Sequence, residues 1–293
     1  MATKKQHIKQ QTDLSEKTKE MIAGTYIDWG KSKEQIWAEL EQRMETKQPA
    51  GRSLFMNTGL RLAIAAAIAL FVGLGLFMQL YTKTMGMPAG EHGFVFLSDD
   101  SKIHLNAQTS ITYKPLLYFL NFSRKVRFEG EAYFEVEPGK KFEVVSDKGK
   151  TAVLGTSFNI YSRNNDYEVT CVTGKVMVTE TQNNKTIILN PGQQAALNSN
   201  GLLDVYSGVN TEQTISWLRN VLNFTSMPLP KVFEEVGRQY GVEIHFPGDL
   251  DNIYTGTFQK STNVETVLNL ICKPFNLKYT RTSNDEYIIS RNQ

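Results

Sequence analysis

The longest apolar run in the chain extends from Leu62 to Leu80, and Gln79 is its only strongly polar residue. Its length matches the roughly 20 residues that an α-helix needs to cross the hydrocarbon core of a bilayer. A cleaved signal peptide would lie at the extreme N-terminus and carry a shorter apolar region. We therefore predict a transmembrane helix over residues 59–81.

Small residues recur along one face of this predicted helix. Ala65, Ala69 and Gly73 are spaced four residues apart, which places them on one side of an α-helix. Such a face lets two membrane helices approach closely, so it is a candidate for helix packing within the membrane. In an alanine-rich segment the same spacing also arises by chance, and both interpretations stay open.

The tail before this span, residues 1–58, contains a short predicted helix with one apolar face. Ser32 and Gln35 form a capping box, which typically begins a helix. Apolar residues follow at helical spacing, and with the preceding tryptophan the set is Trp29, Ile36, Trp37, Leu40 and Met44. So short a tail cannot bury two tryptophans in a core of its own. The face either packs in a small helical hairpin or docks onto another protein.

Beyond a linker at 82–91, repeated period-two alternation predicts an all-β domain over residues 92–200. In its clearest strand, apolar residues alternate with Arg127, Glu129, Glu131, Glu135 and Glu137 around Gly130, where we expect a bulge. Two carboxylates can act as a catalytic pair, but that chemistry requires a cleft. We expect these acids to be solvated on one outward face.

After a second linker at 201–217, strands and helices alternate and predict a C-terminal α+β domain over residues 218–293. Two β-α-β units are expected. Their elements are a strand at 222–224, a helix at 228–240 stopped by Gly241, a strand at 242–246, a strand at 254–258, a helix opened by a Thr262–Glu265 capping box, and two closing strands. The whole chain is thus predicted to be a multi-domain membrane protein.

Charge and composition refine this picture. Arg43, Lys47, Arg52 and Arg61 precede the span, whereas Lys83 is the one nearby basic residue after it, so the N-terminus is predicted to be cytoplasmic. With 41% hydrophobic residues, 21% charged residues and a net charge of +2, the 293-residue chain is ordinary for folded protein and gives no support for direct nucleic-acid binding.

The residues that usually carry chemistry are sparse and scattered. Cys171 and Cys272 are expected to be buried thiols in different domains, because two cysteines are too few for a disulfide framework or a cysteine-rich zinc site. The histidines of the β and C-terminal regions stand alone in the sequence, and no nucleophile and base fall together. We therefore predict a protein that is not an enzyme and that uses no metal or cofactor.

Several segments of the β region, in order and spacing, closely resemble the FecR family. They are LSDDSKIHLNAQTSITY, FEGEAYFEV, VLGTSFNIY, GKVMV and LNPGQQAAL. The stretch from ISWLRNVLNF to YIIS is similar to the domain that follows FecR repeats in Bacteroidetes members, and its two units look like the small domain shared by secretins and TonB-dependent transducers. Where many relatives have an Asp-Gly turn, this chain has Asp99-Asp100 at a hairpin tip.

The resemblance implies an anti-sigma factor that acts as a signal transducer in the bacterial inner membrane. It is expected to cross the membrane once, with the β and C-terminal domains in the periplasm. The implied partners are an extracytoplasmic-function (ECF) sigma factor at the tail, the signalling domain of a TonB-dependent outer-membrane transporter, and an intramembrane protease. Together with the unpaired apolar face of the tail, the resemblance leads us to expect the sigma-factor contacts on the set Trp29, Ile36, Trp37, Leu40 and Met44.

The transporter is expected to add a strand to an open sheet edge, because unpaired backbone groups there can bind an added chain. The preferred edge is Tyr254, Thr255, Gly256, Thr257 and Phe258, and 222–224 and 287–290 are further candidates. An alternative function is a membrane-anchored periplasmic module that binds glycan or cell-wall material through exposed aromatic residues such as Tyr113, Tyr118 and Phe119.

Overall fold

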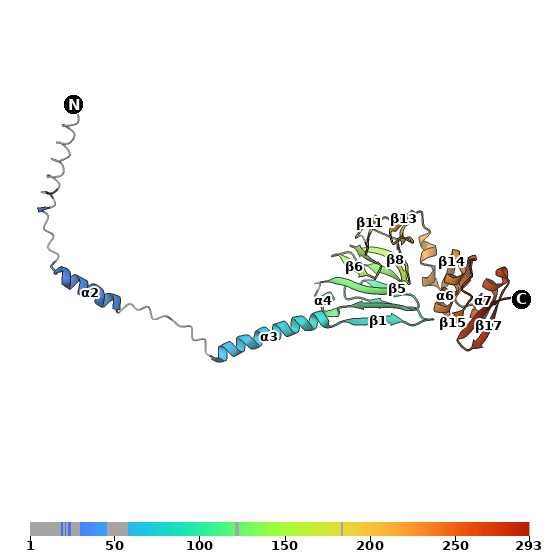
Figure 1. The fold of residues 1–293 in the computed structure, drawn as a ribbon, viewed down its shortest axis with the longest axis horizontal. Coiled ribbons are helices and arrows are strands. Elements are labelled where there is room, and N and C mark those ends of the chain that lie inside the picture. The colour runs from blue at the N-terminus through green and yellow to red at the C-terminus, as the bar shows by residue number, and fades with distance from the viewer. Residues whose placement is uncertain are drawn as a thin grey trace, which may run out of the picture. The chain divides into compact units, whose positions relative to one another are not determined.

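The computed structural model describes residues 19, 21, 23–24, 30–45, 58–120, 123–182 and 184–292. The chain divides into two units, residues 1–67 and residues 68–293. The first unit contains helix α2 (Lys33–Glu45) and the beginning of helix α3 (Thr58–Leu80). The second contains the end of α3 and all the strands found in the described residues, which Figure 1 shows in cyan to red.

Helix α2 begins at the capping box predicted for it. The backbone N–H of Ser32 donates to Gln35 Oε1 at 2.9 Å, and the backbone N–H of Gln35 donates to Ser32 Oγ at 3.3 Å. These two bonds satisfy amides that the first turn of a helix leaves without a partner. The predicted start of the helix is confirmed.

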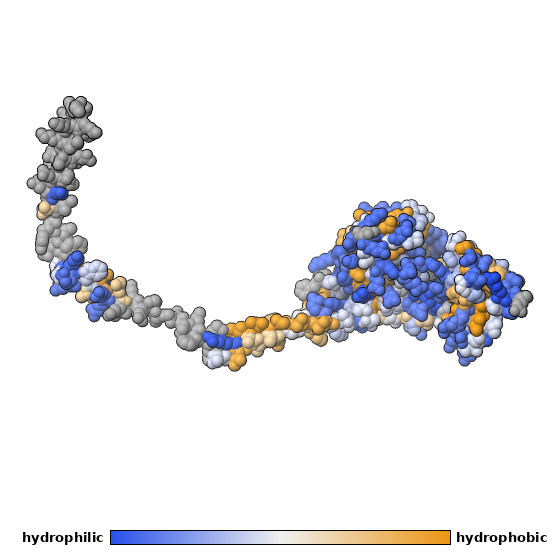
Figure 2. All heavy atoms as spheres, in the orientation of Figure 1, coloured by the Kyte–Doolittle hydropathy of each residue, from blue (hydrophilic) through white to orange (hydrophobic). Residues whose placement is uncertain are grey.

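Helix α3 coincides with the predicted span. It is the one helix among the described residues that is long and apolar enough to cross a membrane. None of its residues is buried inside the chain, and Figure 2 shows its surface largely in the hydrophobic colour. Ala65, Ala69 and Gly73 are all exposed along it. An apolar helix without a protein covering needs another apolar environment, which a bilayer would supply.

The β region forms one curled sheet of thirteen strands. Its central path runs β11-β10-β7-β6-β5-β8-β9-β12-β13. Strands β3 and β4 also pair with β5, and β2 and β1 pair in turn with β3 and β4. The strands are β1 (Lys83–Met87), β2 (Gly93–Phe96), β3 (Lys102–Leu105), β4 (Thr109–Tyr113), β5 (Arg124–Val136), β6 (Phe142–Val145), β7 (Gly149–Val153), β8 (Thr156–Arg163), β9 (Asp166–Cys171), β10 (Val176–Glu180), β11 (Thr186–Leu189), β12 (Gln193–Leu197) and β13 (Leu203–Ser207).

Strand β5 connects the two halves of this sheet by changing partners near Gly130. Before the glycine it pairs with β4 and β6, and from the glycine onward it pairs with β3 and β8. Gly130 has φ of 117°, and a Cβ atom there would lie 2.5 Å from Thr109 Oγ1. Both the backbone conformation and the close approach of β4 therefore favour glycine. The expected bulge is replaced by this exchange of partner strands.

The two predicted linkers contain more structure than their composition indicated. Within 82–91, β1 pairs along its whole length with β4. Within 201–217, β13 pairs with β12, and helix α5 (Thr211–Thr214) and the 3-10 turn η1 (Ser216–Arg219) follow it. The β region also carries one short helix, α4 (Pro115–Phe119), where only strands were expected. Short edge strands lack the long alternation that makes a strand recognisable in sequence.

The core of the β region is built from the apolar face of each strand. Phe134 of β5 and Phe158 of β8 are fully buried and stack with their ring centroids 4.9 Å apart. Cys171 is buried in the same core, as predicted, and Cys272 is buried in a second core; both thiols are free. Burial raises the pKa of each thiol to about 11.

The C-terminal region forms that second core from two small sheets and two helices. One sheet pairs β14 (Val221–Pro228) with β16 (Ile253–Gln259), and the other has the order β15-β18-β17. Its remaining elements are α6 (Leu229–Tyr240), β15 (Glu243–His245), α7 (Val264–Cys272), the 3-10 turn η2 (Lys273–Phe275), β17 (Leu277–Ser283) and β18 (Glu286–Arg291). The predicted order of strands and helices is therefore confirmed.

Three details of this region differ from the prediction. Each helix connects strands of different sheets, so neither unit is a β-α-β crossover within one sheet. Helix α7 is capped by Asn263, whose Oδ1 accepts the backbone N–H of Thr266 at 2.9 Å, in place of the Thr262–Glu265 box. Strand β18, which contains the candidate edge 287–290, is central in its sheet: β17 pairs with it on one side, and β15 covers its residues 286–288 on the other.

Candidate functional site

Helix α2 presents part of the predicted sigma-factor set as an exposed apolar face. Trp37, Leu40 and Met44 are exposed and Ile36 is half-buried, whereas Trp29 lies outside the described residues. Contiguous apolar side chains of this kind mark an interaction site more often than a stable free surface. The structure thus brings these four helical residues together.

Strand β16 carries the predicted transporter-facing residues, but their side chains divide between core and surface. Tyr254 and Phe258 are buried in the second core, with their rings stacked 6.1 Å apart, and Thr255 and Thr257 are exposed. Within the described residues β16 pairs with β14 alone, so its other edge is open. Its exposed side chains are largely small and polar.

A cavity of about 560 Å³ lies along β14, between this strand and the large sheet. All residues from Val221 to Pro228 line it. Because side chains alternate across a strand, an unbroken run of lining residues means that the edge of β14 borders the cavity. The other edge is occupied by β16, so the bordering edge is the one that no described strand pairs with. The further candidate edge at 222–224 therefore lies in a cavity.

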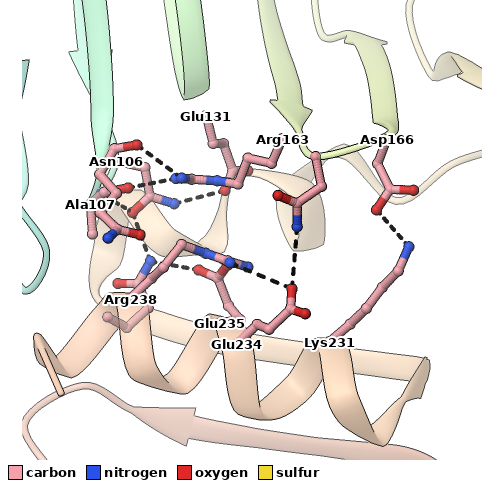
Figure 3. Close-up of polar contacts among 12 residues, drawn as sticks. Asn106, Ala107, Glu131, Arg163, Asp166, Lys231, Glu234, Glu235 and Arg238 are labelled. Carbon is pink, nitrogen blue, oxygen red and sulfur yellow. Dashed lines mark hydrogen bonds and ion pairs between the residues drawn. The ribbon is translucent and has the colours of Figure 1, made fainter. Parts of the chain in front are cut away.

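A cluster of polar side chains joins the large sheet to helix α6 (Figure 3). We call it the junction cluster and define it as Asn106, Glu131, Asn159, Arg163, Glu235, Arg238 and Gln239. Glu131 accepts hydrogen bonds from Asn106 Nδ2 at 2.7 Å and from Asn159 Nδ2 at 3.1 Å. Both carboxylate oxygens of Glu131 are thus held by neutral amides of the sheet.

The helical side of the junction cluster is held by a second set of contacts. Glu235 accepts hydrogen bonds from Arg238 Nη2 at 2.8 Å and from Gln239 Nε2 at 2.7 Å. Gln239, which is fully buried, also donates to Asn106 Oδ1 at 2.8 Å and thereby connects the helix to the sheet. Close by, Lys231 of α6 pairs with Asp166 of β9 at 2.5 Å.

The two carboxyl groups of the junction cluster have opposite pKa shifts. Burial and the nearby charge of Glu235 raise the pKa of Glu131 to about 7. Burial alone would also raise the pKa of Glu235, but the positive charges of Arg238 and Arg163 outweigh it and lower that pKa. Arg163 lies among these groups and donates to the backbone oxygens of Ala107 and Gln108. At neutral pH Glu235 is ionised while Glu131 is partly protonated.

This arrangement predicts a pH-dependent stability. The pKa of Glu131 is higher in the folded chain than its ordinary value, so its contribution is fully present below about pH 4.5 and is lost as pH rises through about 7. We expect the free energy of unfolding to fall by on the order of 2 kcal/mol between about pH 5.5 and pH 8. The measurement is urea unfolding at both pH values. Glu131→Gln should remove most of this difference, and an unchanged difference in that variant would assign it to another group.

The alternation of β5 predicts Glu131 on the solvated face, and this prediction is wrong because α6 covers that part of the strand (Figure 3). Glu129, Glu135 and Glu137 are exposed, as predicted. A signal for the junction was present in α6, where Gln239 falls on the same helical stripe as Val232 and Val236. A polar residue at a core position indicates a hydrogen-bonding partner across an interface.

The other predicted sites are less organised. Of the three aromatic residues proposed to bind glycan, Tyr118 is buried and Tyr113 packs against the core, which leaves Phe119 exposed. His104 pairs with Glu135 at 2.7 Å and His245 with Glu286 at 3.1 Å. Among the described residues, no group of three or more His, Cys, Asp or Glu side chains could hold a metal ion.

Comparison with known families identifies both folded regions. Residues 84–177 match the family described as FecR protein, and residues 221–289 match the family described as FecR, C-terminal. The chain belongs to the FecR family. The first match begins inside β1, which agrees with the pairing of that strand in the sheet. The second covers β14 to β18, the region that packs on the junction cluster.

Solved structures extend this family assignment. Two crystal structures of a candidate anti-sigma factor from Parabacteroides distasonis, at 1.65 and 2.50 Å resolution, are similar to this FecR-family chain with a TM-score of 0.65. Their sequences are 28% and 27% identical to it. They cover 72% and 73% of this chain and are themselves covered completely. Among proteins of curated function, none matches.

Proposed function

We propose that this protein is a single-pass inner-membrane anti-sigma factor. The observation that carries the proposal is the occurrence of the FecR and FecR C-terminal matches on one chain with one candidate membrane span. Similarity to an anti-sigma factor candidate of P. distasonis supports it. The protein is proposed to act by binding and conformational change, without catalysing a reaction.

The proposed topology places the tail in the cytoplasm and the strands in the periplasm. Its support is the basic flank before α3, including Arg52 and Arg61, opposite the sparse flank after it. We propose a tail at 1–58, a span at 59–81, a β domain and a C-terminal domain at 218–293. We propose that the β domain starts at β1, and the pairing of Lys83–Met87 with β4 supports this start.

The tail is proposed to hold an ECF sigma factor against the apolar face of α2. Trp37→Ala and Leu40→Ala should each weaken binding of the full chain to a sigma factor encoded nearby by at least about tenfold, because buried tryptophan and leucine anchors carry much of an interface's energy. Gln42→Ala is the matched control, since Gln42 lies on the opposite side of the same helix. The measurement is an affinity titration of the full chain in detergent micelles.

Two failures of that experiment have different meanings. If the wild-type chain binds no sigma factor encoded nearby, the anti-sigma proposal is wrong. If it binds and the two apolar variants bind equally well, the proposal stands but the contact face lies elsewhere in the tail, where Trp29 is the next residue to test.

In the periplasm, the signalling domain of a TonB-dependent transporter is proposed to add a strand to the C-terminal region. Two edges are available, the open edge of β16 and the edge of β14 that borders the cavity. The β14 edge has the stronger support, because Lys231, Glu235 and Arg238 line the same cavity. A strand bound there would contact the junction between α6 and the large sheet, which provides a path toward α3.

The two edges can be distinguished by one pair of variants. Thr225→Trp fills the β14 cavity without removing a backbone donor, and Thr257→Pro removes a backbone N–H from β16. Loss of at least about tenfold in affinity for the signalling domain with Thr225→Trp alone would assign binding to β14. The reverse would assign it to β16, and wild-type binding by both folded variants would exclude strand addition at either edge.

Transmission across the membrane is proposed to use α3 in one of two ways. The exposed small-residue face of Ala65, Ala69 and Gly73 would allow two copies of α3 to pack closely. Cleavage by an intramembrane protease would instead release the tail with its bound sigma factor. Both routes fit a chain whose two binding surfaces lie on opposite sides of one helix.

A further inference from the structure

Helix α4 exposes large apolar side chains at its C-terminal end. Phe119 is 75% exposed and Leu120, the residue that ends the helix, is 47% exposed. Between them and the core lies Tyr118, whose side chain is buried and packs edge-on against Phe142 of β6. The helix is therefore held firmly on one side while its other side presents apolar surface to the exterior.

Strand register places α4 at the same level as the end of α3. Strand β1 begins at Lys83, three residues after α3 ends at Leu80, a distance of at most about 11 Å along the chain. Lys83 pairs directly with Tyr113, the last residue of β4, and α4 starts two residues later at Pro115. Figure 1 shows α4 beside the point where α3 meets the sheet.

A side-chain contact supports this placement. Lys114, which immediately precedes α4, donates from its Nζ to Gln79 Oε1 of α3 at 3.1 Å. Gln79 is the strongly polar residue of the apolar run Leu62–Leu80 and lies near its end. This hydrogen bond from Lys114 holds the N-terminal end of α4 next to the point at which the apolar surface of α3 ends.

The residues around this boundary have the composition of a membrane interface. Phe77 and Tyr81 of the α3 terminus are exposed and stack with their centroids 5.6 Å apart. Lys83 and Lys114 lie at the same level. Aromatic rings and lysines with apolar stems are the residues that settle at the boundary between hydrocarbon and water.

We propose that Phe119 and Leu120 insert into the outer-leaflet interface of the membrane that α3 spans. This contact gives the β domain a second attachment to the bilayer besides α3 itself, and two attachments fix the orientation of the sheet relative to the membrane. The inference rests on the proposed membrane span. The continuity of the exposed patch with the end of α3 selects lipid as the occupant over a second copy of the chain.

The test is depth measurement with nitroxide labels on the full chain in nanodiscs of phosphatidylethanolamine and phosphatidylglycerol. The background carries Cys171→Ala and Cys272→Ala, and one cysteine is introduced per variant at Phe119, Val72 or Ile188. Ile188 of β11 is the matched control, because it is also a large apolar residue of the same sheet and is 62% exposed. We expect the label at 119 to be accessible to oxygen and protected from a water-soluble nickel chelate, and the label at 188 to show the reverse.

The label at Val72, within α3, separates the two ways in which the experiment can fail. If the label at 72 lies in lipid and the label at 119 is as accessible to the chelate as the label at 188, the contact is wrong and the span stands. If the label at 72 is also accessible to the chelate, the span itself is wrong. Short distances between 119 labels of two chains would show that a second copy covers the patch and would also overturn the proposal.

Discussion

Replacing Arg238 by methionine is expected to lower the free energy of unfolding by about 3–5 kcal/mol. The side chain of Arg238 is only 12% exposed, and its guanidinium pairs with Glu235, whose side chain is 15% exposed. Without it, the carboxylate of Glu235 would remain largely buried beside Glu131, with Arg163 as the remaining positive charge close by. Breaking one side of a buried pair leaves an uncompensated charge, whereas methionine preserves the apolar stem of the side chain. Urea unfolding followed by circular dichroism at about pH 7 measures the change.

Two further variants make this prediction specific. Arg219→Met removes the partner of Glu212 in an ion pair at the surface, where both side chains are more than half exposed, and should cost less than about 1 kcal/mol. Adding Glu235→Gln to Arg238→Met removes the uncompensated charge and should recover much of the loss. If the double variant is as unstable as Arg238→Met, the loss comes from packing and the electrostatic explanation is wrong.

Replacing Arg124 by methionine is expected to cost about 3–5 kcal/mol as well, through the loop that connects β2 to β3. The buried guanidinium donates from Nε to Asp99 Oδ2 at 2.7 Å and binds the backbone oxygens of Glu137 and Lys140. It also lies over the ring of Phe142, 5.5 Å from the centroid. One side chain therefore connects three segments of the β region, and the change is measured by the same unfolding experiment.

A matched control for Arg124 lies on the same strand. Arg127→Met breaks a pair with Asp147 in which both side chains are more than two-thirds exposed, so the loss should be below about 1 kcal/mol. The pKa of Asp99 provides an independent check. Burial would raise it, but the hydroxyls of Tyr118 and Ser101 and the charge of Arg124 outweigh burial and lower it. In Arg124→Met this pKa should rise, which NMR titration of the Asp99 carboxyl would show; an unchanged value would mean that Arg124 does not hold the carboxylate.

These two arginines also show how local and non-local information differ. In sequence Arg124 precedes an alternating strand, and the Asp99-Asp100 pair indicates the tip of a hairpin. The tip is where Asp99 lies, because the chain turns between β2 and β3. Asp99 also binds the buried Arg124, which lies 25 residues further along the chain. This contact depends on the pairing of β3 with β5, and no local pattern in either segment encodes that pairing.

Features that depend on neighbours along the chain follow from the sequence alone. The apolar length of α3, the capping box of Ser32 and Gln35, the alternation of β5 and the stop of α6 at Gly241 each follow from residues within a few positions of one another. Periodicity also decided which face of β5 is apolar. The family followed from motif order, since several short motifs in sequence jointly carry the resemblance.

The cover over each polar face and the strand edges that stay open follow only from the tertiary structure. Glu131 alternates in sequence like Glu129 and Glu135, yet α6 lies over Glu131 and leaves the other two exposed. The edge of β14 borders a cavity and β18 is central, although both have the composition of strands. The local pattern sets the direction in which a side chain points. Whether it then faces solvent or protein is set by segments distant in the chain, because packing and strand pairing join residues far apart in sequence.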